Sequence, residues 1–242
     1  MSLHPVPRVS LSEGVVDQLM GEILAGRWDP GQALPSERTL AELLGVNRGA
    51  VREGIQRLSA AGLVQARQGD ATRVLDYRET AGLDLLPRLL LRADGQVDGA
   101  VVRAIAELRA CIGSDAARLA AGRVDPKASA RLQACAQAMA DAPDRPARQV
   151  AALALWSAVI DAADNVAYRL ALNSLVRSYL PVQALLCDLL AEELDDVAGH
   201  RAVVDAILRG RAELARDAAA ALLSRGGEAL STLSLWLDGG AP

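Results

Sequence analysis

The side chains with the clearest chemistry in this sequence are arginines that gather in one short stretch. Residues 38–73 hold six arginines and three acidic residues, although the formal net charge of the whole chain is −4. A local excess of arginine on an otherwise near-neutral segment is the electrostatic footprint of a surface that meets phosphates. These residues therefore favour hydrogen bonding to nucleic acid over catalysis.

Two short helices must position these arginines. We expect the first over residues 36–44, opened by Ser36 and ended by Gly45. We expect the second over residues 48–61, with Asn47 as its N-cap. Two such helices joined by a turn containing Gly form a helix-turn-helix motif, whose second helix enters the major groove of DNA.

The first turn of the second helix presents the residues expected to read a DNA sequence. Arg48, Gly49 and Arg52 share its outer face, and Arg can pair with both acceptor atoms of a guanine in the major groove. Arg38 is placed to contact a base edge or a phosphate, and Asn47 suits a phosphate. A surface helix that only faces solvent would also carry arginines. The order of helix, turn and second helix at this spacing favours DNA binding instead.

Elements on both sides complete the motif. Residues 10–27 are predicted to form an amphipathic helix with Ser12 as its cap. Short strands at residues 63–67 and 72–75 enclose a tight turn at residues 68–70. A strand pair that directly follows a helix-turn-helix is a wing.

The rest of the chain follows a helical pattern. Hydrophobic residues make up 51% of the chain and aromatic residues only 2%, a composition that favours helices. We therefore expect a mainly α-helical protein: a winged helix-turn-helix in residues 1–75, a linker with a helix at 80–91 in residues 76–97, and an all-helical domain in residues 98–242. The helices expected in that domain cover residues 98–122, 127–141, 146–163, 165–190, 193–209 and 211–237.

Several functional classes are disfavoured. Cys111, Cys135 and Cys187 lie far apart, which suits free thiols of a reducing cytoplasm better than disulfides. No apolar run approaches the ~20 residues of a membrane span, and the N-terminus lacks a signal-peptide core. With two histidines, no Gly-x-Ser-x-Gly and no phosphate loop, no catalytic set is available. We expect a cytoplasmic protein that is not an enzyme, meets no membrane and uses no cofactor.

The string LPSERTLAELLGVNRGAVREGIQRLSAAGLVQARQG closely resembles the N-terminal signature of GntR-type regulators. The resemblance implies a homodimer that reads a palindromic double-stranded operator. The sequence departs from this signature at the wing, where it has GDATRV in place of the usual Gly-Thr-Phe-Val. We therefore expect the wing tip to sit differently in the minor groove. The residues that the resemblance assigns to operator contact are Arg38, Asn47, Arg48, Gly49, Arg52, Gln68 and Gly69.

The C-terminal half resembles the helical ligand domain of the FadR branch of that family. Most members of the larger subgroup bind a divalent metal through an Asp and three histidines. The corresponding positions here hold Ala152, Trp156, His200 and Leu222, of which only His200 could be a ligand. We therefore expect no metal site.

The sequence has an aromatic residue at position 156, and in this it resembles the acyl-coenzyme A receptors of that branch. The resemblance implies a small-molecule effector, an acyl-coenzyme A or an organic acid, contacted by Arg109, Trp156, Tyr179 and His200. Each has a structural alternative: Trp156 and Tyr179 as core residues, Arg109 as the partner of Glu107 or Asp115, and His200 as a hydrogen-bonded helix residue. The function expected is that of a ligand-responsive repressor; the alternative is a constitutive DNA-binding dimer whose helical domain only dimerises.

Overall fold

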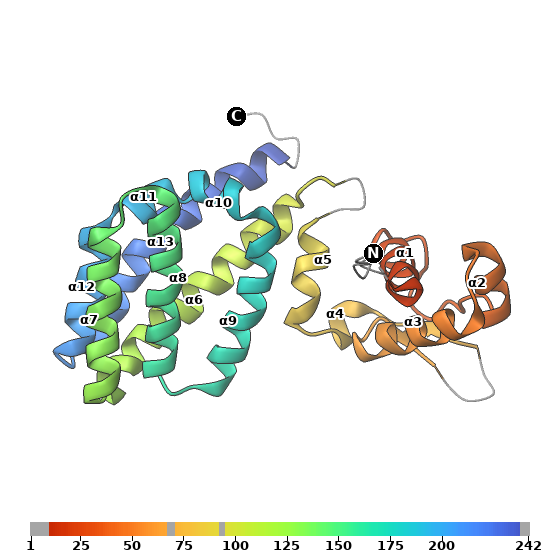
Figure 1. Cartoon of the computed structure of the whole chain (residues 1–242), viewed down its shortest axis with the longest axis horizontal. Coiled ribbons are helices and arrows are strands. Elements are labelled where there is room, and N and C mark those ends of the chain that lie inside the picture. Colours follow the sequence, from red (N-terminus) through yellow and green to blue (C-terminus); the bar gives the residue numbers. More distant parts are fainter. Residues whose placement is uncertain (1–9, 67–70, 92–94, 238–242) are drawn as a thin grey trace, which may run out of the picture. The chain divides into compact units, whose positions relative to one another are not determined.

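The computed structural model describes residues 10–66, 71–91 and 95–237, and these are mainly α-helical (Figure 1). The chain divides into two compact units, Met1–Leu85 with Arg92–Gln96, and Leu86–Leu91 with Val97–Pro242. Within the described ranges, no helix is both long enough and apolar enough to cross a membrane.

The first unit contains three helices followed by a strand pair. β1 and β2 are antiparallel, with Val64 opposite Val74 and Gln65 opposite Arg73. This order of elements is that of a winged helix-turn-helix, as the sequence predicts. Its elements are α1 (Leu11–Leu24), α2 (Glu37–Leu44), α3 (Arg48–Ala60), β1 (Val64–Gln65), β2 (Arg73–Val74), α4 (Tyr77–Thr80) and the 3-10 turn η1 (Leu83–Leu85).

Polar caps fix where the helices of this unit begin. Ser36 Oγ accepts the Thr39 amide at the start of α2, at 3.2 Å. The predicted cap of α1 is wrong: Ser10 Oγ, not Ser12, accepts the Glu13 amide at 3.2 Å. The chain is still extended at Ser10, as an N-cap requires, whereas Ser12 is already helical and buried.

A small apolar core orients α3. Val51, Ile55 and Leu58 occupy its inner face and are almost completely buried. Gly54 lies on the same face, and a Cβ there would come within 2.6 Å of a Val15 methyl group, so α1 and α3 pack too closely for any larger residue. The opposite face of α3 is left to solvent.

The second unit is a helical bundle (Figure 1). The long helices α6 and α13 lie against each other through alanines, among them Ala116, Ala120 and Ala219, which have no exposed surface. Small residues allow two helices to approach closely. Its elements are α5 (Leu86–Leu90), α6 (Gly99–Arg123), α7 (Pro126–Asp141), α8 (Arg145–Ala162), α9 (Val166–Tyr179), the 3-10 turn η2 (Leu180–Val182), α10 (Gln183–Leu189), α11 (Ala191–Asp195), α12 (Val197–Leu208) and α13 (Ala212–Leu237).

Three predicted helices are interrupted. The helix expected over residues 165–190 stops at Tyr179, because Pro181 lacks the backbone N–H that a continuing α-helix would need there. The helix expected over 193–209 breaks at Asp196, which caps α12 by accepting the Gly199 amide at 2.8 Å. The helix expected over 80–91 is also broken, since the backbone is extended at Ala81.

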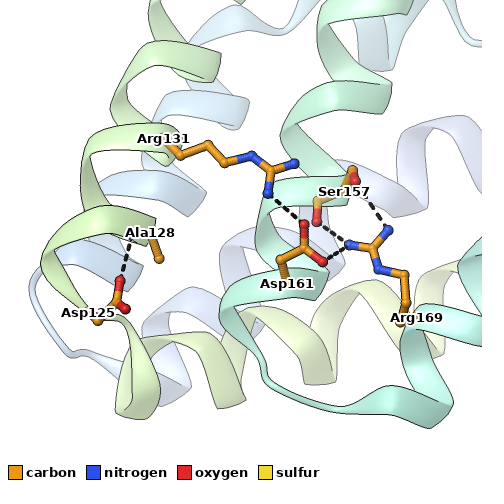
Figure 2. Close-up of polar contacts among 6 residues, drawn as sticks. All are labelled: Asp125, Ala128, Arg131, Ser157, Asp161 and Arg169. Carbon is orange, nitrogen blue, oxygen red and sulfur yellow. Dashed lines mark hydrogen bonds and ion pairs between the residues drawn. The ribbon is translucent and has the colours of Figure 1, made fainter.

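Ion pairs fasten α9 to the neighbouring helices (Figure 2). Arg169 on α9 donates to the Ser157 carbonyl oxygen at 2.6 Å and pairs with Asp161 on α8. Asp161 also accepts from Arg131 on α7 at 2.6 Å. The carboxylate of Asp161 thus joins three helices at the end of the bundle where α8 turns into α9.

Candidate nucleic-acid interface and ligand cavity

The predicted DNA-reading residues lie together at the start of α3 and beside it on α2. All five that the structure describes are exposed to solvent: Arg38, Asn47, Arg48, Gly49 and Arg52. The first turn of a helix carries a partial positive charge and free backbone amides. This surface therefore offers guanidinium groups and amide donors to an anion.

Asn47 holds the first turn of α3 in place. Its Oδ1 accepts the Ala50 amide at 2.9 Å, so the sequence prediction of this cap is confirmed. A Cβ at position 49 would lie 3.1 Å from Asn47 Oδ1, so Gly49 leaves the cap unobstructed. The backbone that carries Arg48 is therefore fixed before any partner binds.

The arginines at this surface differ in their partners. Arg52 reaches back to Glu37 on α2, with Nη2 3.3 Å from Oε2 and Nε 3.4 Å from Oε1. Arg38 lies 3.9 Å from Glu42 on its own helix. Arg48 forms no ion pair with any described residue. Because the side chain of Arg52 is 70% exposed, its pair contributes about 0–1 kcal/mol and can be exchanged for a phosphate or a base.

Only part of the wing can be assigned. Gln68 and Gly69, predicted to contact DNA, lie outside the described residues. Arg73 on β2 donates to the Gly31 carbonyl oxygen at 3.0 Å, which ties the wing to the segment before α2.

A cavity of about 130 Å³ lies inside the helical unit. Its wall is formed mainly by leucine, isoleucine and valine side chains from α6, α8, α9 and α13. Three of the four predicted effector contacts, Arg109, Trp156 and Tyr179, belong to this wall, and His200 does not. Contact of any of them with an effector stays a prediction.

Arg109 has a partner that the sequence does not suggest. Its guanidinium pairs with the carboxylate of Glu193 on α11, rather than with Glu107 or Asp115 on its own helix. Asp115 is held instead by Arg118 Nε at 2.8 Å and by the Tyr168 hydroxyl at 2.9 Å. The partner of Arg109 is 84 positions away in sequence, so helical spacing could not identify it.

The two aromatic residues of the cavity wall, Tyr179 and Trp156, each carry a polar group on an apolar ring. Burial raises the pKa of the Tyr179 phenol, nearby negative groups raise it further and Arg109 opposes them, so the hydroxyl stays protonated at neutral pH. Trp156 is 8% exposed, and its Nε1 has no hydrogen-bond partner in the part of the chain that the structure describes. A Cβ at Gly113 would overlap a Leu223 methyl group and would touch the Trp156 ring at 3.4 Å, an ordinary contact distance, so this glycine makes room for Leu223 beside the ring.

His200 is a buried residue of α12. Its Nδ1 lies 2.9 Å from the Asp196 carbonyl oxygen, and burial lowers the pKa of the ring, so the imidazole is neutral at pH 7. At the other family metal positions, Ala152, Trp156 and Leu222 offer no metal ligand. The described residues contain no group of three His, Cys, Asp or Glu side chains that could hold a metal.

Two further polar residues of the cavity were missed by sequence reasoning. Glu193 is 1% exposed and lies in an acidic stretch that reads as solvated surface. Gln149 is 3% exposed and donates to the Gln183 carbonyl oxygen at 2.9 Å. Neither has a local sequence signal, because the partner of each lies in a distant segment: Arg109 on α6 for Glu193, and the Gln183 carbonyl oxygen on α10 for Gln149.

Each of the two units contains a segment that matches a known protein family. Residues 11–74 match the model of the bacterial regulatory proteins of the gntR family. Residues 104–225 match the FCD domain, and this second match spans half of the chain.

Individual relatives extend the likeness to nearly the whole chain. The HTH-type transcriptional regulator Mce2R of Mycobacterium tuberculosis is 44% identical over 223 residues, which cover 92% of each chain. The fatty acid metabolism regulator protein of Vibrio cholerae is 42% identical over 72 residues, covering 30% of this chain and 26% of that protein. The solved structure of Lar, which controls the agr system of Listeria monocytogenes, has a TM-score of 0.58 at 18% identity, covering 94% of this chain and 100% of that chain. This last likeness shows the fold.

Proposed function

Because this chain belongs to the gntR family of bacterial regulatory proteins and carries an FCD domain, we propose that it is a dimeric repressor that releases its operator when a small molecule binds. The chain is a transcriptional regulator with a DNA-binding helix-turn-helix and an effector-binding domain, and not an enzyme. We further propose that it represses transcription from a two-fold operator, contacts that operator through the residues named below and acts in the cytoplasm.

The observation that carries the DNA-binding proposal is the state of the first turn of α3. Its backbone is capped by Asn47, its inner face is anchored in the core, and its arginines are exposed. In this proposal Arg48 and Arg52 pair with base edges in the major groove, while Arg38, Asn47 and Gly49 meet phosphates and sugar. Gln68 and Gly69 remain proposed contacts of the wing.

The observation that supports effector sensing is the cavity of the FCD domain. The interior of the bundle is hollow beside Trp156 and Tyr179 rather than filled, which favours a ligand site over the alternative of a domain that only dimerises. The apolar wall suits the hydrocarbon part of a small effector, such as an acyl chain. A ligand that binds one dimer arrangement better than the other would shift the population away from the operator-bound form.

The test begins with the operator. Purified full-length protein is incubated with sheared genomic DNA of its source organism, and the retained fragments are sequenced and used in anisotropy titrations. We expect a short palindrome that binds one dimer. Acyl-coenzyme A thioesters, organic acids and uncharged apolar compounds are then added to the complex. Failure to retain any sequence would contradict the operator claim, and unchanged affinity with every compound would contradict the sensor claim.

A further inference from the structure

We propose that the cavity takes an uncharged, mainly apolar molecule with one hydrogen-bond acceptor, such as an alcohol or a ketone, and that it disfavours free carboxylates and phosphates. This inference rests on the proposed function, because it names the class of effector for the same cavity. The charge balance of the wall is its basis. Among the described residues of the wall, Arg109 is the only cationic side chain and Glu193 the only anionic one.

The pairing of these two residues neutralises the wall. Arg109 donates to Glu193 Oε1, while Glu193 Oε2 is buried and has no hydrogen-bond partner among the described residues. Among the described residues, Arg109 is therefore the only group that forms an ion pair with the carboxylate of Glu193, a residue that is 1% exposed. A ligand carboxylate that captured Arg109 would leave Glu193 as an uncompensated buried charge, which is strongly unfavourable.

A neutral acceptor avoids this conflict. A guanidinium has five N–H donors, and Glu193 accepts from only one terminal nitrogen of Arg109. Arg109 is also 24% exposed, so part of its surface remains open. A hydroxyl or carbonyl oxygen can accept from Arg109 while the ion pair stays intact.

The fold holds the pair in place from the side of α13. A Cβ at Gly226 would overlap Glu193 Oε2 and lie 3.2 Å from Arg109 Nη1. Glycine at this position thus makes the space that Glu193 and Arg109 occupy together. The backbone of α13 at Gly226 therefore lies directly against the ion pair.

The remaining wall sets the size and polarity of the occupant. A cavity of about 130 Å³ is close to the volume that holds a single benzene-sized ring in other proteins. The hydroxyl of Tyr179 is a further neutral hydrogen-bonding group on this wall. A short hydrocarbon body with one neutral polar group therefore matches both the volume and the charge.

Matched ligands with one carbon skeleton test this class. Hexan-1-ol, hexan-2-one and hexanoate are titrated into the full-length protein at pH 7.5 by calorimetry, with the thermal unfolding midpoint as a second readout. We expect the alcohol and the ketone to raise the midpoint and to bind at least tenfold more tightly than hexanoate.

A charge change at position 193 sharpens the test. Glu193→Gln leaves the charge of Arg109 uncompensated, so hexanoate should now bind at least tenfold more tightly than hexan-1-ol. Glu192→Gln is the matched control, because Glu192 is the exposed neighbour and should leave the wild-type preference unchanged. If Glu193→Gln does not fold, the double variant Arg109→Gln with Glu193→Gln removes both charges and should still prefer the alcohol.

The outcomes separate this inference from the proposed function. Wild-type protein that binds hexanoate as tightly as hexan-1-ol overturns the ligand class, as does a preference that Glu193→Gln leaves unchanged. Binding of none of the three compounds also overturns it. Each of these results leaves the operator and its response to other effectors to be decided by the genomic selection described above.

Discussion

Two arginine–glutamate pairs in this molecule have the same chemistry and opposite consequences. Arg52 on α3 pairs with Glu37 on α2, where the side chains are 70% and 38% exposed. Arg109 pairs with Glu193 in the FCD domain, where they are 24% and 1% exposed. An exposed pair contributes about 0–1 kcal/mol, whereas breaking a buried pair by removing one partner costs about 3–5 kcal/mol.

The difference separates an exchangeable contact from a fixed one. Water solvates both members of the outer pair, so Arg52 can leave Glu37 for DNA at little cost. Glu193 is only 1% exposed, so bulk solvent cannot take the place of Arg109, and the inner pair keeps the cavity neutral. The charge on the surface of α3 is thus available to a polyanion, while the charge in the cavity is already balanced.

Removing Arg109 should have the largest effect on stability. In Arg109→Ala the carboxylate of Glu193 remains buried without a counter-charge, so the free energy of unfolding should fall by about 3–5 kcal/mol. Urea unfolding at pH 7, followed by circular dichroism, measures it. The control Arg109→Met with Glu193→Leu removes both charges and should recover most of the loss. A single-variant loss below about 1 kcal/mol would make the buried pair no different from the exposed one.

Removing Arg52 should affect DNA binding rather than folding. Arg52→Ala is expected to weaken operator binding by about 1–3 kcal/mol, since a bidentate base contact is lost, with little change in the unfolding midpoint. Fluorescence anisotropy with labelled operator gives the affinity. Arg103→Ala, an exposed arginine of the helical unit, is the control and should bind normally. Equal affinities of the two variants would remove Arg52 from the interface.

Replacing Asn47 distinguishes positioning from contact. Asn47→Ala removes the cap of α3 and should lower the free energy of unfolding by about 0.5–2 kcal/mol. Asn47→Asp keeps a capping oxygen and should restore stability, but its negative charge should weaken operator binding. Thermal unfolding and anisotropy on both variants test this. If Asn47→Asp bound the operator as well as wild type, no phosphate would lie near this residue.

Breaking the exposed pair should have the smallest effect. Glu37→Gln should change the free energy of unfolding by less than about 1 kcal/mol. Operator affinity should stay the same or rise slightly, because Arg52 is released and a negative charge is removed from the interface. Weaker binding, measured by the same anisotropy titration, would show that Glu37 is needed to orient Arg52.

The DNA-binding module could be predicted because its signals are local. Asn47 caps the helix that directly follows it, Gly45 ends the helix before it, and the inner face of α3 repeats with helical spacing. The error at Ser12 arose because two serines stand two positions apart and either could cap α1. Which one does so depends on where the chain leaves its extended conformation, which the sequence does not specify.

The cavity was less accessible to prediction because it depends on contacts between distant segments. Arg109 and Tyr179 were selected by resemblance, not by their own pattern, and both lie on the cavity wall. Glu193 lies on α11, beyond the break at residues 180–182 where a continuous helix was expected, and its ion pair with Arg109 joins segments far apart in sequence. The interruption at Pro181 is one of the points at which the observed bundle departs from the predicted one.

Base reading by the first turn of α3 is the central property proposed for this protein, and a variant of Arg48 tests it most directly. Wild-type protein and Arg48→Ala are titrated against the operator and against variants with each base pair of one half-site changed in turn. We expect Arg48→Ala to lose discrimination at one base pair and to bind the original and changed sites equally there. A variant that keeps wild-type discrimination at every base pair would contradict this proposal.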